Sequence, residues 1–345
     1  MNDLLHSVHE HYPEARALVA AKDVDRVAGL MCRSMGEMCD WTKDRLVIAE
    51  LGGRSFRMLV DQAEDGNSDE VVLVAGEFAN GFMMNNGINP AVVRARAIRD
   101  IVAPEATLVM QANDTINEGN HNLSRDERRR LRSGDAGPLV DRVRRHIGEA
   151  SRVWAFGPSQ GGVVVSAYAA HPDTAITGAT VFETPNVRRR STLQLGRDFM
   201  GSGKHLADQI RLNGYPDAKI VRAHLNSLTA MGMIRYGAGV VLPQNMAILG
   251  IMRAATLEPA LLAALRKGAG VTHLWTTGDR VSPDSDNVQI AKGVRALPET
   301  GRYESYRFAG DLADHSSTNA IVVCAGGLRR ARELGKVQST NMEQA

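Results

Sequence analysis

The sequence predicts an α/β fold with a mostly parallel central sheet that helices cover on both faces. Apolar, β-favouring runs alternate with stretches of helical periodicity through the middle of the chain, as in repeated strand–helix–strand units. A strand, a tight glycine-rich turn and a helix follow one another at 152–168. Residues 187–267 carry helical signals and little strand signal, and they predict a helical cap inserted between two strands of the sheet.

Length and composition set the class of protein. A chain of 345 residues with 43% hydrophobic residues can bury a sizeable core, as one large domain with an insertion or as two domains. The net charge of +2 favours neither nucleic acid nor an acidic partner. Arginine clusters at 128–132, 144–145 and 188–190 lack neighbouring aromatic residues, and the first two are interleaved with acidic ones. We therefore expect solvated helix faces there, not a nucleic-acid-binding surface.

Cysteine usage and the first residues bear on location. Cys32, Cys39 and Cys324 make an odd count without short metal-ligand spacing, which is typical of reduced thiols in an intracellular protein. The N-terminus has no apolar region of the kind a signal peptide carries, and no run approaches 18 uninterrupted apolar residues. We expect neither a signal peptide nor a membrane span, and a cytoplasmic location.

The chain begins with a predicted helical extension, 1–44, in which Pro13 opens a helix and apolar residues recur at helical spacing as far as Asp40. An α/β core is expected over 45–186 and 268–334, with the cap at 187–267 and a flexible tail at 335–345. The expected elements of the core are a hairpin of strands 45–50 and 55–60, strand 71–75, helix 91–102, strand 106–111, one or two helices in 124–149, strand 153–156 with its helix to about 171, strand 176–182, strand 271–276, helix 286–294, strand 303–308 and helix 319–334.

The turn at 157–162 carries the strongest chemical signal. Gly157-Pro158-Ser159-Gln160-Gly161 fits the pattern G-x-S-x-G, in which a serine lies at the apex of a sharp strand-to-helix turn. Glycines are needed there because the reversal brings backbone segments together where a Cβ would clash. The turn exposes the hydroxyl and places the next residue at a helix N-terminus. An ordinary strand–helix turn has the same residues, so the partners of Ser159 decide between the two interpretations.

Two later loops supply such partners. A serine hydroxyl is a weak nucleophile near neutral pH and needs an imidazole base that a carboxylate holds in one tautomer. Asp279 follows the strand 271–276, and His315 lies between the strand 303–308 and the last helix. Loops after parallel strands gather at one edge of the sheet, so Ser159, Asp279 and His315 are expected to lie near one another.

These residues resemble those of the α/β-hydrolase fold superfamily. The resemblance rests on the Ser159 turn, on Gly278-Asp279-Arg280 after a strand, and on a late histidine, His315, before the last helix. The order of the elements from Arg45 to Leu334 fits as well. The resemblance implies that Ser159 is a nucleophile, His315 a general acid and base, and Asp279 the carboxylate that orients the histidine.

The resemblance also implies an oxyanion hole with two backbone donors. One is the N–H of Gln160, and the other comes from Glu77 or Phe78 in the loop after Ala75-Gly76, where many members of the superfamily have His-Gly.

The carboxylate has alternatives. Asp279 is also a common turn residue after a glycine such as Gly278. Glu183, at the end of its own strand, and Asp284 are alternative acids, and Asp314 is a further residue that can orient the region around His315.

The expected function is a serine hydrolase, without metal or organic cofactor, that cleaves a carboxylic ester or related small acyl compound. The Met, Leu and Ile content of the predicted cap favours a partly apolar substrate. The alternative from another class is a non-catalytic binding or structural protein with the same fold. Within the enzyme class, Ser159-Gln160-Gly161 also resembles cutinases and phage-encoded esterases of cell-wall lipids, although those enzymes lack a helical insertion here.

Overall fold

The centre of the fold is an eight-stranded sheet in the part of the chain that the computed structural model describes, residues 5, 8–10, 12–31, 35–51, 54–62, 69–78, 83–84, 87–88, 90–113, 123–148, 150, 152–199, 243–297, 301–309 and 318–336. The strand order is β1-β2-β6-β3-β7-β8-β9-β10. The strands are β1 (Leu46–Leu51), β2 (Arg54–Asp61), β3 (Glu70–Phe78), β6 (Thr107–Asn113), β7 (Arg152–Pro158), β8 (Gly178–Phe182), β9 (Gly270–Thr276) and β10 (Tyr303–Phe308). Two short strands, β4 (Met83–Met84) and β5 (Gly87–Ile88), pair separately.

Most pairs in this sheet are parallel. β2 runs antiparallel to both β1 and β6, and the remaining neighbours are parallel. All residues of β8 and β9 are buried, because a parallel strand covered on both faces exposes no side to water. At the other end of the sheet, the side chain of Ile48 in β1 is exposed. The predicted α/β fold with a mostly parallel sheet is confirmed.

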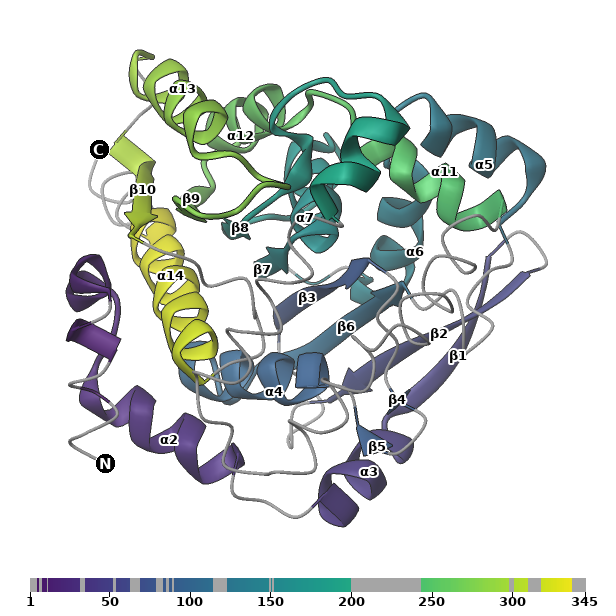
Figure 1. The fold of residues 1–345 in the computed structure, drawn as a ribbon. Helices are drawn as coiled ribbons and strands as arrows, with labels where there is room; N and C mark the ends of the chain where they lie inside the picture. The colour runs from purple at the N-terminus through teal and green to yellow at the C-terminus, as the bar shows by residue number, and fades with distance from the viewer. Residues whose placement is uncertain are drawn as a thin grey trace, which may run out of the picture.

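Helices cover both faces of the sheet (Figure 1), and each face has its own hydrophobic core. On one face lie α2 (Ala21–Met31), α4 (Pro90–Val102) and α14 (Thr318–Lys336). On the other lie α5 (Arg125–Arg132), α6 (Gly137–Ile147), α7 (Gln160–Ala170), α11 (Pro243–Met252), α12 (Leu257–Arg266) and α13 (Asp284–Arg295). The last helix ends at Lys336, two residues beyond the expected end at Leu334.

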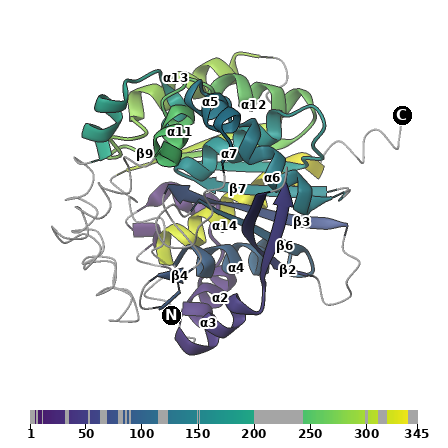
Figure 2. The same cartoon turned by 90° about the vertical axis from the view of Figure 1, so that its right-hand side faces the viewer.

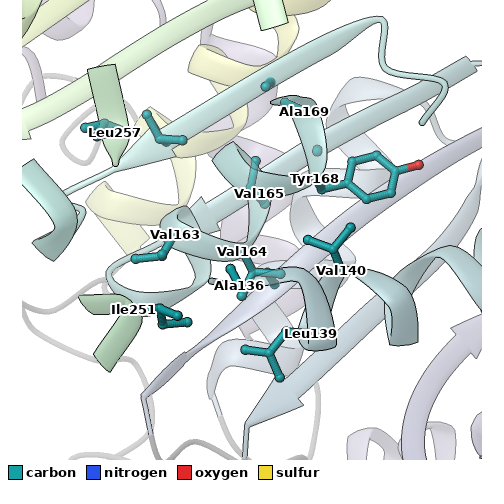
Figure 3. Packing of buried hydrophobic residues seen from close by; sticks show 14 of the residues in the cluster. Ala136, Leu139, Val140, Val163, Val164, Val165, Tyr168, Ala169, Ile251 and Leu257 are labelled. Atoms are coloured by element: carbon teal, nitrogen blue, oxygen red, sulfur yellow. The ribbon is translucent and has the colours of Figure 1, made fainter. Parts of the chain in front are cut away.

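Helix α7 is the most enclosed helix of the second face. Figure 3 shows its apolar residues Val163, Val164 and Tyr168 among side chains of the neighbouring helices, including Leu139 of α6 and Ile251 of α11. Burying an aliphatic or aromatic side chain of this size contributes roughly 1.5–3 kcal/mol. The helix that follows Ser159 is therefore held rigidly against the sheet.

The N-terminal extension is divided where one continuous helical pattern was expected. It forms a 3-10 turn, Pro13–Ala17, followed by α2 and by α3 (Met35–Lys43). The backbone N–H of Ala20 donates to the carboxylate of Asp23, so this side chain marks the start of α2. The same carboxylate binds Arg329 of α14. Asp23 therefore both caps the start of α2 and joins it to α14.

The predicted cap is described in two parts, 187–199 and 243–267. Residues 192–199 are helical, and α11 and α12 follow at 243–266. Helix α12 packs on α7 and α13, and α11 packs on α5, an arrangement that Figure 1 and Figure 2 both show. These two helices thus extend the layer over the sheet. Residues 200–242 lie outside the described residues, and the division into core and cap stays a prediction.

Candidate active site

Ser159 lies at the apex of the turn between β7 and α7. Its backbone has φ 49° and ψ −126°, a region that residues with a Cβ rarely adopt. Such a conformation costs on the order of 1–3 kcal/mol and persists only where the surroundings impose it. Here the N–H of Ser159 donates to the carbonyl of Phe182 in β8 at 2.8 Å, and its carbonyl accepts from Gly162 at 3.0 Å. The predicted strand, turn and helix are confirmed.

Close backbone approach explains two glycines of the turn. A Cβ on Gly157 would lie closer than 3.0 Å to the backbone of Gly161. A Cβ on Gly161 would in turn lie closer than 3.0 Å to the carbonyl of Ala75 in β3. The first turn of α7 therefore rests directly on the end of β3, which is where the second oxyanion donor was expected.

The end of β3 differs from the expected strand. The sequence predicted a strand that ends at Ala75, whereas β3 continues to Phe78 through a shift in its pairing with β6 between Ala75 and Phe78. Such an irregularity is a β-bulge, which turns backbone groups away from the ladder. Glu77 lies within this irregularity and Phe78 at its end, and the first turn of α7 contacts the preceding residues Ala75 and Gly76. Gln160 is the first residue of that helix, where N–H groups are positioned to serve a ligand.

A buried ion pair fixes Glu77. Nη1 of Arg94 in α4 lies 2.5 Å from Oε1 of Glu77, and the Arg94 side chain has no exposed surface. Both residues also affect the pKa of the Cys324 thiol in α14. Burial is the dominant effect and raises this pKa, Arg94 lowers it, and the carboxylates of Glu183 and Glu77 raise it. Of these residues, Arg94 and Glu77 are in direct contact, so the ion pair joins α4 to the end of β3. Sequence reasoning missed Arg94, because an arginine within a helical pattern indicates a solvated face.

Asp279 follows β9, and both of its oxygens bind its own loop. Oδ1 accepts from the N–H of Val281 at 2.7 Å, and Oδ2 accepts from the N–H of Ser282 at 3.0 Å. These two bonds orient the carboxylate. Each carboxylate oxygen has two lone-pair sites, so both can still accept from an imidazole.

A buried network fastens this loop to the sheet. Nδ2 of Asn287 in α13 donates to the carbonyl and the hydroxyl of Ser282, both at 2.9 Å. Oδ1 of Asn287 lies 2.9 Å from Nε2 of His273 in β9. Burial lowers the pKa of His273 to about 4, so this histidine is neutral near pH 7. The prediction that His273 is buried within a strand is confirmed.

The two alternative acids have different surroundings. Glu183 is buried at the end of β8 with φ 49°, and its Oε1 accepts from the hydroxyl of Thr276. Asp284 is held by Arg307, at 2.7 and 2.8 Å, and by Nε1 of Trp275 at 2.9 Å. The Arg307 contact lowers the pKa of Asp284. These bonds tie α13 to β9 and β10, which is a structural task.

The arginine cluster at 188–190 is not the solvated helix face that the sequence predicted. Arg189 is exposed, but Arg190 is buried and lies in a segment after β8 that is neither helix nor strand. The expectation is wrong for Arg190 because the carbonyl groups that receive its guanidinium belong to Pro185 and Val281, and Val281 is far away in the sequence.

His315 and Asp314 lie outside the described residues. β10 ends at Phe308 beside Thr276 of β9, and α14 begins at Thr318. The placement of His315 beside Asp279 therefore stays a prediction.

Within the described ranges, no group of three or more His, Cys, Asp and Glu side chains is placed to hold a metal ion. No single described helix is long and apolar enough to cross a membrane; α11 and α12 together meet those criteria but are bent by 67°.

The comparisons with known proteins agree with this architecture. No protein-family model and no curated protein matches the sequence. Among solved structures, a bacterial membrane phospholipase A described as a virulence factor aligns over 92% of both chains with a TM-score of 0.50 and 14% identity. A protein from Acinetobacter baumannii assigned as a lipase aligns over 90% of this chain and 96% of its own, with a TM-score of 0.51 and 12% identity. An α/β hydrolase from a Medee basin deep-sea metagenome aligns over 81% and 97% of the two chains, with a TM-score of 0.48 and 12% identity.

At such identities the likeness concerns the fold. It adds to what this structure shows by itself: a largely parallel eight-stranded sheet, helices on both faces and a strained turn at Ser159. The chain therefore has the α/β-hydrolase fold.

Proposed function

We propose that the protein is a serine hydrolase that cleaves a carboxylic ester or related acyl compound through an acyl-enzyme. The strained backbone of Ser159 carries this proposal. Ser159 is partly exposed, and strain of this kind at the apex of a strand–helix turn is typical of a catalytic nucleophile. A lipase and a phospholipase among the similar structures point the same way.

The mechanism follows from the roles of three side chains. Oγ of Ser159 attacks the carbonyl carbon while His315 takes its proton, and Asp279 orients the imidazole and stabilises its charge. The N–H of Gln160 and that of Glu77 or Phe78 hold the oxyanion. The tetrahedral intermediate formed by this attack then collapses. The bond from the carbonyl carbon to the alcohol oxygen breaks, His315 protonates the departing alcohol, and the acyl group stays on Ser159. Water then attacks the acyl-enzyme with His315 as base, which releases the acid and restores the serine.

Variants of the nucleophile and of the candidate acids test the proposal through their rates of hydrolysis of short p-nitrophenyl esters. Ser159→Ala should abolish hydrolysis, and Asp279→Asn should lower kcat by about 10⁴-fold, as loss of a triad acid does. Asp284→Asn is the matched control, because this acid is engaged by Arg307 and Trp275, and it should change kcat less than about two-fold.

Two outcomes would contradict the proposal. Equal rates for wild type and Ser159→Ala would favour the non-catalytic binding protein. A large loss in Glu183→Gln with a small one in Asp279→Asn would instead transfer the acid role to Glu183.

A further inference from the structure

Arg190 joins three segments around the Asp279 loop. Its side chain has no exposed surface. Nη2 donates to the carbonyl of Val281 at 2.6 Å and to that of Pro185 after β8. A buried arginine that binds two carbonyls from separate loops fixes one loop relative to the other.

The bond to Val281 reaches Asp279 through a single peptide unit. The carbonyl of Val281 accepts from Arg190, and the N–H of Ser282, on the same peptide, donates to Oδ2 of Asp279 at 3.0 Å. A cation on the carbonyl polarises the peptide and strengthens its N–H as a donor. The guanidinium, the peptide and the carboxylate thus form one chain.

The other side of Arg190 faces the first helical residues of the predicted cap. Nη1 lies 3.1 Å from Oδ2 of Asp198, within the helical stretch 192–199, and the backbone N–H of Arg190 donates to the carbonyl of Arg253 after α11. The two described parts of the predicted cap, 187–199 and 243–267, therefore meet at this residue.

Among the described residues, three charged groups act on Arg190: Asp198, Asp279 and Arg188. Burial lowers its pKa, Asp198 and Asp279 raise it, and Arg188 lowers it. Its guanidinium remains a cation between two carboxylates, which suits a role in holding one of them.

We propose that Arg190 is a positioning residue for Asp279: through the Val281–Ser282 peptide it fixes the carboxylate that orients His315, and through Asp198 it joins that carboxylate to the start of the predicted cap. The inference rests on the proposed function. Arg190 touches no reacting atom, so its removal should change kcat and leave KM nearly unchanged.

The test compares Arg190→Met and Arg190→Lys with Arg99→Met. Arg99 of α4 is a matched control, because it is also a buried arginine that binds a carboxylate, Asp61 at 2.7 Å, and a carbonyl, that of Ala106. Ala106 precedes the first residue of β6, whereas Asp279 follows the last residue of β9, so the two arginines bind at opposite ends of the parallel strands. Rates are divided by the number of active sites that a fluorophosphonate titrates, so partial unfolding does not count as lost catalysis.

We expect Arg190→Met to lower kcat by 10-fold to about 100-fold, as misplacement of a catalytic group does. The acid limb of its kcat/KM profile should move to lower pH, because a poorly held carboxylate stabilises the imidazolium less. Loss of the Arg190 charge alone would move this limb to higher pH, so the direction separates positioning from charge. Arg190→Lys keeps the charge but does not span both carbonyls, and should show a smaller loss in the same direction. Arg99→Met should retain the wild-type profile.

Arg190→Lys decides the matter if Arg190→Met does not fold. A wild-type kcat and acid limb in Arg190→Lys would overturn the inference while leaving the proposed function intact. A wild-type protein that the fluorophosphonate does not label would overturn the proposed function, and the inference with it.

Discussion

Replacing Ser159 by glycine should stabilise the protein while abolishing its activity. Ser159 has φ 49° and ψ −126°, and a side chain in such a conformation costs on the order of 1–3 kcal/mol. Glycine adopts it without that cost but loses roughly 0.5–1 kcal/mol to the greater freedom of its unfolded chain. Ser159→Ala is the reference, because it also lacks the hydroxyl but keeps the Cβ. Subtracting the two contributions predicts that Ser159→Gly is about 1 kcal/mol more stable than Ser159→Ala.

Ser166 in the middle of α7 provides the comparison site. It is buried and donates to the carbonyl of Val163 at 3.0 Å, and its backbone is helical. There the glycine variant should be about 1 kcal/mol less stable than the alanine variant, the usual cost of glycine in a helix. The two Gly–Ala differences should thus have opposite signs and lie about 2 kcal/mol apart.

Urea unfolding of the four variants, with equal m-values, measures both differences. If Ser159→Gly is less stable than Ser159→Ala by the amount found at Ser166, the turn stores no strain. The link between backbone strain and an exposed nucleophile would then be wrong.

Two further predictions concern buried charge. Arg94→Met should lower the free energy of unfolding by about 3 kcal/mol, because it removes the buried cation that pairs with the Glu77 carboxylate. Arg330→Met breaks the more exposed pair with Glu304 and should lower that free energy by less than about 1 kcal/mol. Equal losses in the two variants, measured by urea unfolding, would contradict this prediction. The pKa of His273 is about 4 in the folded protein, below the value of about 6.5 for an unfolded chain. Between these pH values the unfolded chain binds more protons than the folded one. The free energy of unfolding should therefore fall as pH drops from about 6.5 to 4, by up to about 3 kcal/mol. His273→Gln should flatten this part of the stability profile measured by urea unfolding from pH 7 to pH 4, and an unchanged slope would show that other groups cause it.

The sequence predicted the elements whose signals are local. The Ser159 turn could be predicted because an apolar strand, close-packed glycines and an apolar helix occur within 17 consecutive residues, 152–168. The burial of His273 could be predicted because every neighbour in its strand is apolar or β-favouring.

Features that depend on distant partners could not be predicted. Arg190 follows Arg188 and Arg189 in a charged run, and its burial depends on a carbonyl 91 residues later. Arg94 has a polar role that only the bulged end of β3 reveals. Likewise, the contact that joins Asp23 of α2 to α14 is made with Arg329, 306 residues away in the sequence. The placement of Ser159, Asp279 and His315 in one triad stays a prediction, because His315 lies outside the described residues.

The most direct test of the proposed nucleophile is labelling with a fluorophosphonate followed by mass spectrometry of the modified peptide. We expect one adduct, on Ser159, that is lost in Ser159→Ala and formed much more slowly in His315→Ala, while unfolded protein is not labelled. Labelling at another serine, or no labelling of the folded protein, would contradict it.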